Sequence, residues 1–175
     1  MAYRAMKGDS RDAWIKNFAV AFAATGGTTF RKANLTDANF SQTRLKSTDF
    51  REAILIRVCF KKAQQLDRIR PGKTLLSQPD VRELLSTGYG YKKSYSGANL
   101  DGANLDGANL NEANLKQCNL NDASLRATNL EWENLSQIFA INTNFTRCNL
   151  TGACIEAWNM DKTTILDEVD CQYVF

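Results

Sequence analysis

Basic and aromatic residues gather in one stretch of the chain, residues 61–95. Eight residues of this stretch are Lys or Arg and three are Asp or Glu, a net charge of +5. The basic residues are Lys61, Lys62, Arg68, Arg70, Lys73, Arg82, Lys92 and Lys93, and Tyr89, Tyr91 and Tyr95 stand close to the last two. Basic side chains beside aromatic rings can bind phosphate groups of nucleic acid or lipid, although this cluster is small. A solvated helix face and a surface for a protein partner are the other interpretations.

Trp132 and Phe139 form a second candidate contact surface. They lie in the stretch E-W-E-N-L-S-Q-I-F-A-I-N-T, and the regular spacing of the chain places both rings on outward positions. Large exposed aromatic rings can mark a site of protein contact. The simpler interpretation is a local bulge that tucks both rings away.

Enzymatic chemistry is hard to assemble from the remaining residues. The chain has no histidine, which removes the commonest general base and the commonest metal ligand. No glycine-rich phosphate loop and no Cys-x-x-Cys pair occurs, and the carboxylates lie scattered on positions expected to point outward. We therefore expect no catalytic residue, no cofactor, no metal ion and no enzyme.

The five cysteines do not form a disulfide framework. Cys118 and Cys148 fall on inward positions and should be buried and inert. Cys154 and Cys171 are spaced in the sequence so that they could approach each other, and a disulfide between them is one option. Reduced thiols in a cytoplasm are the simpler interpretation.

The elements that position these side chains follow from a repeat of five residues, a period that fits neither helix nor strand. An apolar residue occupies the centre of each repeat. The centres are Phe30, Leu35, Phe40, Leu45, Phe50, Leu55, Phe60, Leu100, Leu105, Leu110, Leu115, Leu120, Leu125, Leu130, Leu135, Ala140, Phe145, Leu150, Ile155, Met160 and Ile165.

Two other positions of the repeat are also regular. Two residues before the centre, 17 of the 21 repeats carry Ala, Thr or Cys, and one residue before it 13 carry Asn or Asp. A small side chain leaves room for the larger one beside it, whereas Asn and Asp hydrogen-bond locally and favour turns. The pattern predicts a coil that turns a corner every five residues and stacks on its neighbours as a solenoid.

The run A-N-L-D-G-A-N-L-D-G-A-N-L-N-E-A-N-L at residues 98–115 resembles the pentapeptide-repeat proteins, which are numerous in cyanobacteria. The resemblance covers residues 28–60 and 98–165. It implies an all-β solenoid, a right-handed quadrilateral β-helix with four repeats in each coil. The 21 repeats would then make about five coils.

The sequence suggests five parts. We expect an N-terminal capping helix at 1–27, repeats at 28–60, a basic insertion at 61–95, further repeats at 96–167 and a C-terminal cap at 168–175. The capping helix is indicated by the apolar stripe Trp14, Phe18 and Phe22, and a signal peptide is the rival interpretation. Pro79 and Gly88 bracket a short helix inside the insertion.

Charge is distributed unevenly along the chain. Residues 1–95 carry a net charge of +10 and residues 96–175 a net charge of −7. Some pentapeptide-repeat proteins protect DNA gyrase by imitating the acidic surface of DNA. The acidic residues that could present such a surface here are Asp101, Asp106, Glu112, Asp122, Glu131 and Glu133. The basic half and the insertion would weaken the imitation.

These observations favour a non-catalytic scaffold that binds an unidentified protein partner. The candidate contact residues are Arg68, Arg70, Lys73, Arg82, Tyr89, Tyr91, Lys92, Lys93, Trp132 and Phe139. A DNA-mimic regulator and a phosphate-binding or nucleic-acid-binding module are the alternatives, and nucleic acid is the less favoured partner. No apolar stretch is long enough to span a membrane, and we expect a cytoplasmic location.

Overall fold

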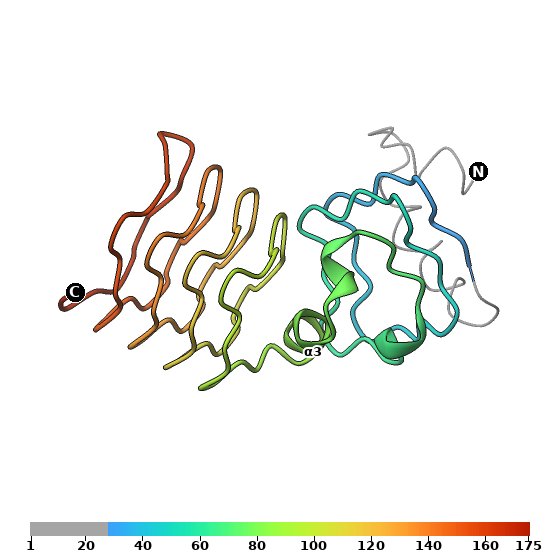
Figure 1. The fold of residues 1–175 in the computed structure, drawn as a ribbon, viewed down its shortest axis with the longest axis horizontal. Coiled ribbons are helices and arrows are strands. Elements are labelled where there is room, and N and C mark those ends of the chain that lie inside the picture. The colour runs from blue at the N-terminus through green and yellow to red at the C-terminus, as the bar shows by residue number, and fades with distance from the viewer. Residues whose placement is uncertain (1–27) are drawn as a thin grey trace. The chain divides into compact units, whose positions relative to one another are not determined.

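The computed structural model describes residues 28–175 (Figure 1), so the capping helix expected at 1–27 lies outside the described residues. The chain divides into two compact units, Met1–Thr87 and Gly88–Phe175, called unit 1 and unit 2 below. In unit 2, successive coils stack on one another along the chain (Figure 1, yellow-green to red).

The regular five-residue repeats close a turn after their apolar centres. The amide of Ala33 donates a hydrogen bond to the carbonyl of Phe30 at 2.9 Å, and the same bond joins Ala103 to Leu100 at 2.8 Å. The second residue after the centre has a positive φ, as in Lys32 at 58°. This left-handed residue turns the chain through a corner at each repeat.

The coils pair through the residue that precedes each centre. Parallel bridges join Asn34 to Ile54 and Asn104 to Ser124, and within the regular coils the two partners always stand four repeats apart. Each coil therefore contains four repeats and has four sides. The described residues form single-residue bridges rather than continuous strands, because a left-handed residue interrupts every side.

Asparagine side chains hold the corners, as the sequence indicates. The Asn34 side-chain oxygen accepts a hydrogen bond from the amide of Thr36 at 3.0 Å, and Asn114 does the same for Lys116 at 3.0 Å. These bonds confirm that Asn in this position serves the turn.

The apolar centres make the core of both units. In unit 1, the buried side chains Phe30, Phe40, Phe50 and Phe60 pack against one another with ring centroids 5.3 to 6.0 Å apart. Rings one coil apart are stacked, whereas rings two repeats apart in the sequence and on opposite sides meet edge to face. In unit 2 the equivalent positions are mostly Leu, and they are equally buried.

The last coil of unit 2 departs from the predicted register. Ile165 bridges Asn144, 21 residues before it, so one extra residue after Met160 moves Ile165 from the expected centre to the bridging position. Met160 keeps a central position, and both side chains remain exposed.

Helical turns follow the coils of unit 1 along the chain. They are η3 (Leu66–Arg68), η4 (Leu75–Ser77) and α3 (Pro79–Thr87). The α3 helix confirms the short helix expected inside the insertion, beginning at Pro79 and ending before Gly88, which has a φ of 69°. Its Val81, Leu84 and Leu85 side chains are buried.

Regular bridging continues into the predicted insertion at both of its ends. Tyr89 bridges Asn109 at the regular spacing, whereas Asp49 bridges Arg70, one position beyond it. The extra residue in the second pair is accommodated by η3, which lies just before Arg70. The five-part division of the chain, including the C-terminal cap, stays a prediction.

Candidate binding surfaces

The basic and aromatic residues singled out in the insertion belong to two different units. Arg68, Arg70, Lys73 and Arg82 lie in unit 1, whereas Tyr89, Tyr91, Lys92 and Lys93 lie in unit 2. Each group is therefore described separately.

Arg82 has a structural role in unit 1. Its guanidinium group donates hydrogen bonds to the carbonyl of Leu76 at 2.7 Å and to that of Ser77 at 3.3 Å. These carbonyls close η4, so Arg82 ties α3 to the preceding helical turn. Arg68, Arg70 and Lys73 lie at or near the surface, and Arg68 lies 3.7 Å from Asp67 in a loose ion pair.

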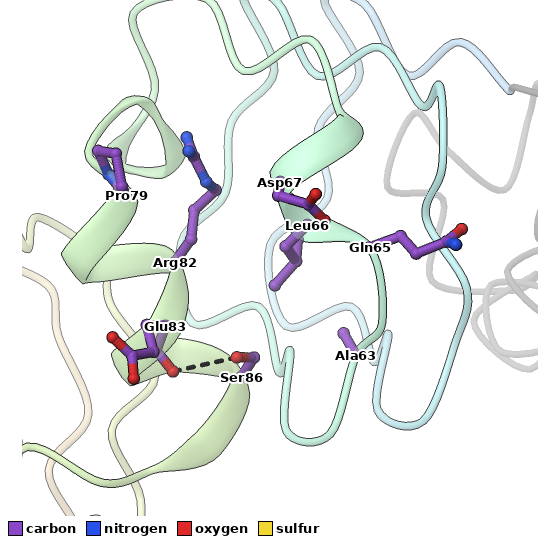
Figure 2. A pocket seen from close by; sticks show the side chains of 8 residues that line it. All are labelled: Ala63, Gln65, Leu66, Asp67, Pro79, Arg82, Glu83 and Ser86. Atoms are coloured by element: carbon purple, nitrogen blue, oxygen red, sulfur yellow. Dashed lines mark hydrogen bonds between the residues drawn. The ribbon is translucent and has the colours of Figure 1, made fainter.

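A pocket of about 270 Å³ lies between α3 and the segment around η3 (Figure 2). Its lining residues are Ala63, Gln65, Leu66, Asp67, Pro79, Arg82, Glu83 and Ser86. The lining carries charges of both signs, and the Arg82 guanidinium already binds backbone carbonyls. The pocket therefore gives no reason to assign a ligand.

In unit 2, Glu112 organises two of the predicted contact residues. Its carboxylate pairs with the Lys92 ammonium group at 3.3 Å and accepts a hydrogen bond from the Tyr91 hydroxyl at 3.2 Å. The Lys92 nitrogen also lies 5.0 Å from the centre of the Tyr91 ring. Tyr91 and then Glu112 raise the pKa of Lys92 by stabilising its charged form.

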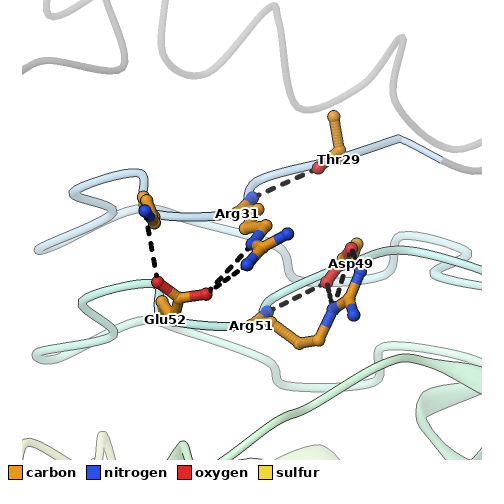
Figure 3. A network of polar contacts seen from close by, with 6 residues as sticks. Thr29, Arg31, Asp49, Arg51 and Glu52 are labelled. Carbon is orange, nitrogen blue, oxygen red and sulfur yellow. Dashed lines mark hydrogen bonds and ion pairs between the residues drawn. The ribbon is translucent and has the colours of Figure 1, made fainter.

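Unit 1 carries a charged network that sequence reasoning missed (Figure 3). Arg31 binds Glu52 on the next coil at 2.7 Å, and Arg51 binds Asp49 at 2.7 Å. The hydrogen bonds from Arg51 lower the pKa of Asp49 to about 2. A search for opposite charges separated by one full coil would have found the pairs between coils, including Arg57 with Asp37.

Trp132 and Phe139 are both displayed on regular coils. Trp132 is 52% exposed and Phe139 is 44% exposed, so the expected bulge that hides them is wrong. The physical reason is that both residues keep the register of the repeat, Trp132 on a left-handed corner with a φ of 57° and Phe139 in a bridge to Asn159.

Trp132 belongs to a larger aromatic group that the sequence did not reveal. Its ring lies 5.7 Å from that of Tyr173 and 6.4 Å from that of Phe175, centre to centre. Gly152 leaves the space for this ring, because a Cβ atom there would stand 2.6 Å from the indole. The signal in the sequence was a glycine one full coil after Trp132.

Glu133 corrects the expectation that the carboxylates point outward. It occupies an inward position that most repeats give to a small residue, and its exposure is 1%. Neither carboxylate oxygen has a partner with good hydrogen-bond geometry among residues 28–175, and the nearby backbone of Leu115 and Ala113 only partly offsets the effect of burial. Burial raises the pKa of Glu133 to about 8, and the residue cannot contribute to an acidic outer surface.

The cysteines are separate thiols in the structure. Cys118 and Cys148 are buried as expected, and their thiols donate to the carbonyls of Tyr95 at 2.9 Å and Leu125 at 2.7 Å. Burial raises the pKa of Cys118 to about 12 and that of Cys148 to about 11. Cys154 is partly exposed and Cys171 is exposed.

Two absences apply to the part of the chain that the structure describes. Nowhere in residues 28–175 do three or more His, Cys, Asp or Glu side chains come together as a set that could hold a metal ion. Within the same residues, helices long and apolar enough to cross a bilayer are not found.

Comparison with known proteins places the repeats in context. The sequence model of pentapeptide repeats matches the chain in 8 copies, over residues 27–64, 96–131 and 123–157, which is more than half of the chain. No curated protein is detectably similar to the chain in sequence.

Several solved structures resemble the chain. HetL, a pentapeptide repeat protein involved in heterocyst differentiation regulation in the cyanobacterium Nostoc sp., is 20% identical with a TM-score of 0.29. The match covers 83% of this chain but only 58% of HetL. The pentapeptide repeat protein Rfr23 from the cyanobacterium Cyanothece 51142 is 22% identical with a TM-score of 0.39, over 81% of this chain and 89% of Rfr23.

QnrB1, a plasmid-mediated fluoroquinolone resistance protein, is 18% identical with a TM-score of 0.29. That match covers 83% of this chain and 81% of QnrB1.

Proposed function

Because the chain belongs to the pentapeptide-repeat family, we propose that it is a non-catalytic scaffold that binds a protein partner. The binding surface consists of side chains on the outside of its right-handed quadrilateral β-helix. The solenoid interior is filled with the apolar centres, so recognition falls to the outward positions. A cytoplasmic location is part of this proposal.

The observation that carries the proposal is the display of large aromatic side chains on regular coils. Trp132 and Phe139 stand on outward positions that other repeats mostly give to polar residues, and about half of each side chain is exposed. Exposed aromatic residues are enriched at the centres of protein interfaces. Keeping them in water without a partner favours aggregation, so a partner accounts for their presence.

Basic residues at the surface supply the second part of the proposed contact surface. In unit 1 the exposed basic residues are Arg68, Arg70 and Lys73. In unit 2 the proposed surface includes the aromatic residue Tyr89, which is 51% exposed. Charged residues of this kind contribute mainly to the rate and specificity of association. Arg82 is removed from the contact set, since its guanidinium group binds the carbonyls that close η4.

Capture of partners from a lysate of the source cells tests the proposal. The intact chain is compared with a Trp132→Ser, Phe139→Ser double variant and with Arg68→Glu, Arg70→Glu, Lys73→Glu. Ile54→Ser is the matched control, because Ile54 is an exposed apolar residue of unit 1. We expect a protein that the intact chain and the control retain and that the aromatic double variant retains about tenfold less. An identical set of bound proteins for all four chains would contradict the proposal.

DNA mimicry is the second candidate function, favoured by the acidic character of unit 2. Residues 88–175 carry eleven acidic and six basic residues, a net charge of −5. QnrB1 is a fluoroquinolone resistance protein. Some members of the family protect gyrase by imitating the acidic surface of DNA. Two findings weaken the idea here, because Glu133 is buried and Lys92 pairs with Glu112. Unchanged supercoiling by gyrase in the presence of the chain would exclude it.

Phosphate binding through the basic residues is a further alternative. It predicts affinity for an oligonucleotide that falls steeply as salt increases. Absence of binding at low salt would end this alternative, and the first proposal would be unaffected.

A further inference from the structure

Trp132, Tyr173 and Phe175 form one exposed surface on unit 2, called the aromatic corner below. The three rings contact one another, with Tyr173 and Phe175 5.7 Å apart between centroids. Even so, 52% of Trp132, 44% of Tyr173 and 70% of Phe175 remain exposed. The rings therefore support one another and still offer a continuous aromatic surface to the solvent.

The position of the Trp132 ring is fixed by its surroundings. The side chain rises from a corner of the coil, and the indole packs on Gly152 in the next coil, where any larger residue would collide with it. A ring held in this way loses little conformational freedom when it binds a ligand. The Trp132 ring of the aromatic corner is therefore preorganised for binding.

Glu131 places a fixed negative charge in the same turn as Trp132. Its carboxylate accepts hydrogen bonds from the side-chain amides of Asn149 at 2.8 Å, Asn111 at 3.3 Å and Asn129 at 3.4 Å. The ion pairs within residues 28–175 do not include Glu131. Three neutral donors thus hold an anion whose charge is not neutralised by a neighbouring cation.

The C-terminal stretch that supplies Tyr173 and Phe175 is mostly acidic. Residues 148–175 contain five acidic residues and one basic residue, Lys162, and one of the five, Glu168, pairs with Arg147. An exposed aromatic surface in an acidic setting attracts cations, because the face of an aromatic ring carries negative potential. A guanidinium group suits it best, since this group stacks on aromatic rings and also pairs with a carboxylate in one plane.

We propose that the aromatic corner, together with Glu131, binds an arginine-bearing basic segment of a protein partner. This inference rests on the proposed scaffold function and names the chemistry of what one of its surfaces recognises. The guanidinium group stacks on the exposed face of Trp132 or Phe175, and its N–H groups point toward the Glu131 carboxylate. Acidic residues nearby attract the remaining basic side chains of the segment.

A labelled peptide with blocked ends that alternates arginine and glycine tests the inference by fluorescence anisotropy against the intact chain. The matched peptide replaces every arginine with lysine, which keeps the charge and removes the planar group. We expect the arginine peptide to bind about fivefold more tightly than the lysine peptide. Equal affinity for the two peptides, or no binding of either at low salt, would overturn the inference.

Variants locate the binding. Trp132→Leu should weaken arginine-peptide binding about fivefold or more, whereas Trp132→Tyr, which keeps an aromatic face, should retain most of it. Glu131→Gln keeps an acceptor for the asparagine amides but removes the charge, so the affinity should fall and depend less on salt. Ile141→Ala, at an exposed apolar residue of unit 2, is the control and should bind as the unchanged chain does. An effect of Ile141→Ala that equals the effect of Trp132→Leu would contradict the assignment.

Two further measurements separate this inference from its rivals. Thermal unfolding followed by circular dichroism establishes that each variant folds, and Trp132→Tyr provides an interpretable result if Trp132→Leu does not. Neutral lipid vesicles that bind the intact chain but not Trp132→Leu would assign the corner to a membrane surface and overturn the inference. The lysate experiment could show a protein that the intact chain retains and the aromatic double variant loses, while the intact chain does not bind the arginine peptide. That combination would contradict only the ligand chemistry and leave the scaffold function intact.

Discussion

At the scale of single residues, burial of the Glu133 side chain in unit 2 carries a large desolvation cost. A carboxyl group without well-aligned hydrogen-bond partners in an apolar interior is costly when ionised and much less so when protonated. Its pKa of about 8 means that the folded protein keeps this proton at neutral pH, whereas the unfolded chain, with a pKa near 4.5, releases it. The stability linked to Glu133 is therefore complete below pH 4.5 and is lost as pH rises through about 8.

This linkage predicts a pH-dependent free energy of unfolding. Between pH 5 and pH 9 the unchanged protein should lose about 4 kcal/mol from Glu133, since each pKa unit corresponds to about 1.4 kcal/mol. Denaturant unfolding at several pH values measures the slope. Glu133→Gln should flatten it, and Glu156→Gln, at an exposed position, should keep it. Equal slopes in all three proteins would show that Glu133 does not cause the effect.

The left-handed corner residues give a second prediction at this scale. Gly107 has a φ of 66°, and a Cβ atom there would meet nothing within 4 Å. Gly107→Ala therefore tests the backbone conformation alone and should lower the free energy of unfolding by about 1 kcal/mol. The reverse change, Ala127→Gly at a φ of 53°, should raise it by a similar amount. Changes of the same sign in the two variants would be inconsistent with this explanation.

At the scale of elements, α3 depends on its attachment to η4. The charged Arg82 side chain donates to the Leu76 carbonyl at 2.7 Å, and bonds from charged groups contribute about 1.5 to 3 kcal/mol. Arg82→Met should therefore increase amide hydrogen exchange across Pro79–Thr87, measured by mass spectrometry. Lys73→Met removes a charge at the surface and serves as the control. Unchanged exchange in Arg82→Met would mean that burial of Val81, Leu84 and Leu85 is sufficient to hold the helix.

The elements differ in how well sequence reasoning predicts them. The coil and α3 have periodic or terminal signals, such as Pro79 and Gly88, because local backbone preferences set their limits. The turns η3 and η4 contain three residues each, too few to produce a periodic pattern.

Contacts between coils can be predicted from the sequence only in part. The outward position of Trp132 follows from the repeat, but its contact with Tyr173 depends on how the chain leaves the last regular corner. Glu133 shows the limit most clearly. Its place in the repeat predicts an inward side chain, whereas its charge argues for an outward one, and the backbone register prevails.

At the scale of the whole molecule, each coil contacts mainly the coils before and after it, so protection of the interior depends on intact stacking. The reactivity of the cysteine thiols can report whether the coils remain stacked. Cys171 is exposed, whereas Cys118 and Cys148 are buried with raised pKa values, and only thiolates react readily. A thiol reagent should modify Cys171 first, Cys59 and Cys154 more slowly, and Cys118 and Cys148 only when coils separate. Mass spectrometry of the modified chain checks this order, and early modification of Cys118 would contradict it.

The four-sided coil also constrains how such a surface can change during evolution. Duplication of a complete coil inserts a new layer and leaves every later side chain on its original side. Duplication of one five-residue repeat keeps the core pattern equally well, yet it moves all following residues of that unit by a quarter turn. A binding surface built from successive coils, such as Trp132 over Gly152, would be dismantled without any loss of foldability. Selection on binding would therefore preserve the number of repeats in this region even where selection on folding would not.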